Sequence, residues 1–118
     1  MGGIDYLRLD KTKDKSYAFD HAFDHRVSQK AVFEDTAKKV VADVVRGGNA
    51  TVFAYGATGS GKTYTMMGSD EAPGLILQTT DEIFARAADA AEDAAVSVTM
   101  QYVEILSLIH ISEPTRPY

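Results

Sequence analysis

A short apolar segment followed at once by a glycine-rich turn constrains this chain more than any other feature. Residues 50–55, Ala-Thr-Val-Phe-Ala-Tyr, do not alternate between apolar and polar side chains, which is typical of a strand buried on both faces of a parallel sheet. The turn matches the pattern G-x-x-x-x-G-K-[ST] and reads Gly56-Ala57-Thr58-Gly59-Ser60-Gly61-Lys62-Thr63. This combination predicts a strand, a tight loop and then a short helix that begins near Lys62 and ends near Gly68.

The chemistry expected of this turn is phosphate binding. Its glycines let the backbone turn tightly, so that successive N–H groups and the positive end of the following helix can surround phosphate oxygens. Lys62 is expected to reach the β- and γ-phosphates of a nucleotide, and Thr63 to offer its hydroxyl to Mg²⁺. The candidate cofactor-binding residues are Gly56, Ala57, Thr58, Gly59, Ser60, Gly61, Lys62 and Thr63.

Hydrophobic periodicity predicts two longer helices around this loop. The first is expected over residues 29–45, with Ser28 as its N-cap and apolar residues at spacings of three and four. The second is expected over residues 75–92, with Phe84 on its packed face. Short alternating segments predict further strands at 6–9, 16–19 and 96–102. This order of elements indicates an α/β fold of the P-loop NTPase type, with a mostly parallel sheet flanked by helices.

Composition excludes several classes of function. The chain has no cysteine, which excludes a disulfide scaffold, a zinc–thiolate site and a cysteine nucleophile. Its formal net charge is -5 and its basic residues are not clustered, so we expect no nucleic-acid partner. No apolar run reaches the about 18 residues of a membrane span. The first residues do not form a secretory signal, and a cytoplasmic location is expected.

Two further observations concern metal binding and catalysis. His21 and His25 stand beside Asp20 and Asp24, but spacing alone does not bring these side chains together, and we expect no metal site there. Phosphoryl transfer also needs a positioned water and a second protein group on the metal side. The chain contains no Asp-x-x-Gly motif that could serve this purpose. The sequence therefore predicts phosphate binding without visible machinery for cleavage.

Residues 49–68 resemble the kinesin motor domain, in which Thr-Met follows the lysine and threonine of the phosphate loop, as Thr65-Met66 does here. Residues 17–24 are similar to the family's Phe-Asp-x-x-Phe segment, which explains the repeated Ala-Phe-Asp-His better than metal binding does. Residues 102–105 resemble the start of its Tyr-x-Glu-Ile-Tyr-Asn strand. The resemblance covers about residues 16–105.

This resemblance implies a microtubule motor that uses ATP with Mg²⁺, binds ADP and tubulin, and works in the cytoplasm on the cytoskeleton. It also implies that Tyr64 packs on adenine, which adds Tyr64 to the candidate cofactor-binding residues. Ala57 stands where most kinesins have glutamine. Together with residues 49–52, Ala57 favours the eighth kinesin class, the microtubule-length regulators.

The same resemblance predicts that the chain holds only part of a motor. The family's switch motifs and microtubule-binding helices would follow residue 105, and its Arg-x-Arg-Pro adenine segment is not matched here. Residues 1–105 are therefore expected to be the N-terminal part of a motor domain, with an incomplete sheet and no complete catalytic site. Residues 106–116 read like a translated transposase sequencing adapter, so residues 106–118 are expected to be a non-native tail.

Two alternative functions stay open at this point. The chain could be another P-loop NTPase, such as a small nucleotide kinase, although the Thr65-Met66 pair argues against this. It could also be a truncated fragment that binds nucleotide without catalysis.

Overall fold

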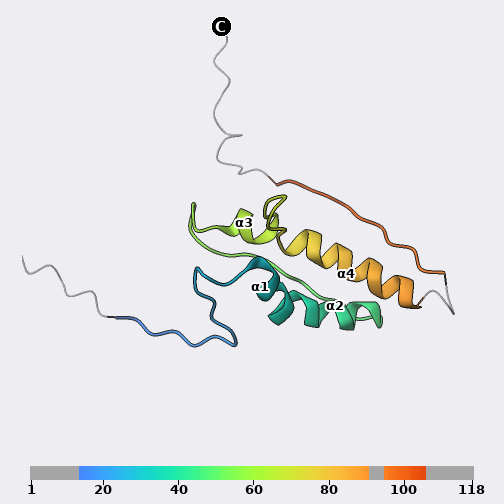
Figure 1. Cartoon of the computed structure of the whole chain (residues 1–118), viewed down its shortest axis with the longest axis horizontal. Helices are drawn as coiled ribbons and strands as arrows, with labels where there is room; N and C mark the ends of the chain where they lie inside the picture. Colours follow the sequence, from blue (N-terminus) through green and yellow to red (C-terminus); the bar gives the residue numbers. More distant parts are fainter. Residues whose placement is uncertain (1–13, 91–94, 106–118) are drawn as a thin grey trace, which may run out of the picture.

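The structure is a computed structural model that describes residues 14–90 and 95–105. Its helices are α1 (Gln29–Asp35), α2 (Ala37–Val45), α3 (Lys62–Met66) and α4 (Leu75–Ala90), shown in Figure 1. The strand expected at 6–9 and the tail expected at 106–118 lie outside the described residues.

The helix expected over residues 29–45 is present as two helices, which corrects that prediction. Ser28 caps α1 as expected, because its side-chain oxygen accepts a hydrogen bond from the backbone N–H of Ala31 at 3.2 Å. Thr36 separates α1 from α2 with a non-helical backbone (φ -120°, ψ -90°). Its hydroxyl donates to the carbonyl of Val32 at 2.5 Å. Such a bond from threonine to the preceding turn competes with regular helix geometry, and this accounts for the break.

The core lies where α4 packs along α1 and α2 (Figure 1). Phe33, Ala37 and Leu75 form its buried cluster, and the side chains of Val32 and Met66 pack against them. Because Met66 belongs to α3, the helix that follows the glycine-rich loop is attached to this core. The core therefore fixes the position of the loop's helical end.

The packed face of α4 differs from the expected one at Phe84. This side chain is 56% exposed, although the periodicity predicted it on the packed face. Glu82 and Arg86, which flank it in sequence, are half-buried and form an ion pair at 2.7 Å. Among the described residues α4 contacts α1, α2 and α3, and none of these contacts buries Phe84. The helix is described as far as Ala90, and its expected end at residue 92 lies outside the described residues.

The expected parallel sheet does not form among the described residues. Segments 16–19, 50–55 and 96–102 are extended, but a single isolated bridge between Gly68 and Pro73 is the β-type pairing in residues 14–90 and 95–105. Phe53 and Tyr55 are 78% and 95% exposed, so segment 50–55 is not buried on both faces. A strand exists only through hydrogen bonds to a neighbouring strand, and these segments have none here. The radius of gyration, 22.3 Å, accordingly exceeds the about 13 Å of a compact domain of this length.

Candidate phosphate-binding site

The glycine-rich loop curls through two left-handed glycines. Gly59 has φ +79° and Gly61 has φ +97°, and a Cβ atom at either position would meet nothing within 4 Å. Glycine is therefore favoured at these positions by backbone conformation and not by lack of space. Between them, the N–H of Ser60 donates to the carbonyl of Ala57 at 3.0 Å. The result is a tight turn that ends directly at α3.

The start of the loop is held by close contacts. A Cβ atom at Gly56 would lie 2.6 Å from the hydroxyl oxygen of Ser60, so the two residues approach closely. The ammonium group of Lys62 donates to the carbonyl oxygens of Gly56 and Ala57, the latter at 2.9 Å. Lys62 thus closes the turn on itself and lies against the backbone atoms that surround it.

The other predicted site residues lie in or beside the first turn of α3. The N–H groups of the first residues of any α-helix have no acceptor within the helix. In α3 these residues are Lys62, Thr63 and Tyr64, and the first helical bond closes from the N–H of Thr65 to the carbonyl of Gly61 at 2.9 Å. Thr63 is exposed and Tyr64 is 55% exposed. The lysine, the threonine hydroxyl and the helix N-terminus therefore lie at one end of α3, whereas the roles assigned to them stay predictions.

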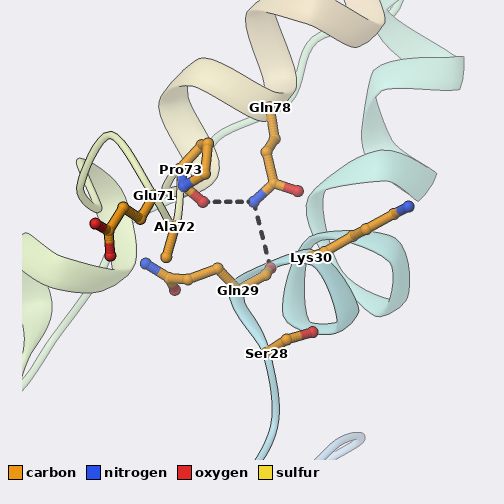
Figure 2. Close-up of a pocket in the computed structure, with 7 residues that line it drawn as sticks. All are labelled: Ser28, Gln29, Lys30, Glu71, Ala72, Pro73 and Gln78. Atoms are coloured by element: carbon orange, nitrogen blue, oxygen red, sulfur yellow. Dashed lines mark hydrogen bonds between the residues drawn. The ribbon is translucent and has the colours of Figure 1, made fainter.

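A junction of two glutamines supports α3, and no sequence pattern indicated it. The side-chain amide of Gln29 donates to the carbonyl of Tyr64 at 2.5 Å. The side-chain amide of Gln78 donates to the carbonyls of Pro73 at 2.8 Å and Gln29 at 3.3 Å, as Figure 2 shows. Two of these bonds, from Gln29 to Tyr64 and from Gln78 to Gln29, join residues that are 35 and 49 positions apart in sequence, and no local pattern predicts such pairs.

A cavity of about 360 Å³ lies at this junction. Its walls come from the start of α1, from the loop before α4 and from the first turn of α4 (Figure 2). The loop is tight: a Cβ atom at Gly68 (φ +71°) would lie 2.2 Å from the carbonyl oxygen of Ala72. The N–H of Gly74 donates to the carbonyl of Met67 at 3.1 Å, which returns the chain to the end of α3.

Ionisable side chains near the core form pairs along the helices. The ammonium of Lys38 donates to the carboxylate of Glu34 at 2.8 Å, one helical turn away. This hydrogen bond lowers the pKa of Glu34 and raises the pKa of Lys38 from their ordinary values. The side chains of Glu34 and Lys38 are 42% and 35% exposed, so solvent screens the pair and it contributes little to stability. Within the described ranges, no helix combines the length and apolar character that crossing a membrane requires.

Comparison with known proteins identifies the family. The sequence model for the kinesin motor domain matches residues 5–107. This chain belongs to the kinesin motor-domain family. The match includes the whole glycine-rich loop and begins before the segment from which the resemblance was drawn. Membership implies the P-loop NTPase fold, while the sheet of that fold does not form among the residues that the structure describes.

Individual kinesins give the same result. The chain is 46% identical to kinesin-like protein KIF19 of Homo sapiens over 101 residues, which are 86% of this chain and 10% of that protein. It is 45% identical to KIN-8B of Arabidopsis thaliana over 103 residues, 86% of this chain and 12% of the relative. KIN-8A of Oryza sativa is 36% identical over 115 residues, 96% of this chain and 15% of the relative.

The relatives support the eighth kinesin class, which Ala57 and residues 49–52 favoured, because two of these names carry its number. The chain spans 10–15% of the length of these kinesins. What a complete kinesin does is therefore a proposal for this chain.

Proposed function

We propose that this chain is the nucleotide-binding portion of an ATP-dependent microtubule motor of the eighth kinesin class. The observation that carries the proposal is the turn through Gly59 and Gly61, which leads directly into Lys62 and Thr63 at the start of α3. A turn of this shape brings backbone N–H groups, the Lys62 ammonium and the Thr63 hydroxyl close to the start of α3. Those groups suit the oxygens of a polyphosphate and its metal ion.

Each residue has a distinct role in this proposal. The loop amides and the Lys62 ammonium bind the β- and γ-phosphates, and Thr63 offers a hydroxyl oxygen, a ligand type that Mg²⁺ accepts alongside waters and phosphates. When bound, Mg²⁺ neutralises charge on the phosphate oxygens. The exposed ring of Tyr64 stacks on adenine, since a planar aromatic ring favours an offset face-to-face contact. Microtubules are the proposed track, and the cytoplasmic cytoskeleton the proposed location.

The test of nucleotide binding is Lys62→Ala in the complete protein, with Mg-ATP affinity measured by calorimetry. We expect an affinity loss of at least about tenfold, because charge-assisted hydrogen bonds to phosphate are among the strongest polar contacts. The matched control is Lys39→Ala, which removes an exposed lysine from α2. Equal affinities for the two variants would contradict the proposed site.

A second expectation concerns the 118-residue chain by itself. It contains no Asp-x-x-Gly motif, and positioning of water and metal supplies most of the rate enhancement in phosphoryl transfer. This observation favours the alternative of a nucleotide-binding fragment without catalysis. We expect phosphate release from Mg-ATP at the rate of a buffer blank, with or without microtubules. Microtubule-stimulated release by the purified chain would show that it holds catalytic groups that we did not recognise.

A further inference from the structure

The helix that carries Tyr64 is too short to hold its own position. α3 has 5 residues, whereas isolated helices need about 12–15 residues to be even marginally stable in water. The last carbonyl groups of any helix also have no N–H donor within that helix, so they need partners from elsewhere. The carbonyl of Thr63 accepts a bond from the N–H of Met67 at 2.8 Å. The carbonyl of Tyr64 instead accepts from the side chain of Gln29 at 2.5 Å, and Gln29 belongs to α1.

Gln29 is in turn held by Gln78 of α4. The Gln78 amide nitrogen donates to the backbone carbonyl of Gln29 and to that of Pro73 (Figure 2). The two bonds that Gln78 donates are part-buried, so water competes with them less than it would on an open surface, whereas the bond from Gln29 to Tyr64 is exposed. Two amide groups therefore join the start of α1, the loop before α4 and the backbone of Tyr64.

The geometry points to Gln29 as a positioning residue for the nucleotide base, acting through the backbone of Tyr64, with Gln78 as its support. This inference rests on the proposed function, in which the Tyr64 ring contacts the base. The bond from Gln29 reaches the residue that carries that ring. The phosphate-binding turn has separate contacts of its own, from Lys62 to Gly56 and Ala57. Loss of Gln29 therefore affects recognition of the base more than recognition of the phosphates.

The experiment compares two probes on the complete protein: Mg-ADP and Mg-tripolyphosphate, which has no base. Gln29→Met keeps the length of the side chain and removes its donor. We expect about fivefold weaker binding of Mg-ADP, the effect of one hydrogen bond of average strength, and less than about twofold change for Mg-tripolyphosphate. Lys30→Met is the matched control. Lys30 is the next residue of α1 and lines the same cavity, but its side chain extends away from Glu71 and Ala72 (Figure 2).

A double-mutant cycle with Tyr64→Leu separates positioning from general stability. If Gln29 acts through Tyr64, the double variant binds Mg-ADP as weakly as Tyr64→Leu alone, because the second change removes nothing further. Independent effects that add in the cycle would overturn the inference. So would equal losses for both probes, or a Gln29→Met variant that behaves as Lys30→Met does.

Gln78→Met provides a second route if Gln29→Met does not fold. It removes the support and leaves the bond from Gln29 to Tyr64 in place, so we expect about a twofold loss for Mg-ADP and none for Mg-tripolyphosphate. An unchanged Mg-ADP affinity would overturn the role of Gln78. Lys62→Ala distinguishes a failure of the proposed function from a failure of the positioning role of Gln29. If it leaves Mg-ADP binding intact, the proposed function fails; if it abolishes binding while Gln29→Met has no effect, the positioning role alone fails.

Discussion

The helices of this chain and its extended segments differ in where their backbone hydrogen bonds come from. α1, α2 and α4 form these bonds within themselves and bury Phe33, Ala37 and Leu75 between them. Segments 50–55 and 95–105 have no such bonds within the described part of the chain and expose most of their large apolar side chains. A helix can therefore form wherever its apolar face finds one partner, whereas a strand also needs a neighbour along its whole length.

The same contrast extends to the candidate site. Its helical end is attached to the core through Met66 and through the bond from Gln29 to Tyr64. Its other end continues into segment 50–55, where Phe53 and Tyr55 are exposed. The glycine-rich loop thus connects the helical core to segment 50–55, which has no partner strand among the described residues.

The largest expected effect is on the folding of the 118-residue chain as a whole. Leaving about 300 Å² of apolar surface uncovered forfeits about 7.5 kcal/mol at about 25 cal/mol per Å². This loss is comparable to the whole stability of a domain, about 5–15 kcal/mol. We expect the chain to bind a hydrophobic dye, to aggregate on concentration and to melt without a cooperative transition. A sharp two-state melt of a monomer, raised by Mg-ADP, would show that the extended segments find partners within the chain.

A smaller effect distinguishes the helical core from the extended segments. Phe33→Ala removes a side chain that is 5% exposed in the helical core, and such changes cost about 3–5 kcal/mol. Phe53→Ala removes a side chain of the same kind from an exposed segment. We expect far-ultraviolet circular dichroism to show a loss of helix for the first variant. The Phe53→Ala variant should keep its helix content and bind less dye. Equal loss of helix in both variants would contradict the distinction between the helical core and the extended segments.

The smallest effect belongs to the pair of Glu34 and Lys38. The pKa of Glu34 is lowered by its bond to Lys38, so the contribution to stability is present above the ordinary glutamate pKa and is lost as the pH falls through the lowered one. The raised pKa of Lys38 keeps its part of the contribution until the pH rises through that value. Lys38→Met should therefore reduce helix content slightly at neutral pH and not at about pH 3.

Lys39→Met is the control for this measurement, since Lys39 lies beside Lys38 on α2 and is exposed. Glu82 and Arg86 of α4 also act on the charge of Lys38, in opposite directions. A difference between the Lys38→Met variant and the wild type that persists unchanged at about pH 3 would show that packing of the Lys38 stem, and not its charge, carries the effect.

The sequence predicted the features that depend on neighbouring residues. The cap at Ser28, the start of α3 at Lys62 and the start of α4 at Leu75 follow from local capping and periodicity, and the structure confirms them. The break at Thr36 was missed, because periodicity does not report a hydroxyl that bonds to the preceding turn. The sheet predicted from segment 50–55 is not confirmed among the described residues, since apolar composition indicates suitability for burial and does not supply a partner strand.

In the candidate site, too, local features could be predicted from the sequence and long-range contacts could not. The pattern from Gly56 to Thr63 predicted a tight turn before a helix, and the left-handed Gly59 and Gly61 are what such a turn requires. The contacts of Gln29 and Gln78 could not be predicted, because they join residues that are distant in sequence. Roles that depend on nucleotide, metal or tubulin stay predictions until binding is measured.

Under the proposed function, the position of Lys62 has a consequence for how a nucleotide is bound. Its ammonium group already has two acceptors, the carbonyl oxygens of Gly56 and Ala57. A phosphate must therefore replace these oxygens in an exchange of partners, and the heat released is the difference between the new contacts and the old ones. We expect the loop to favour anions of higher negative charge, because these compete better with the carbonyl oxygens for the ammonium group.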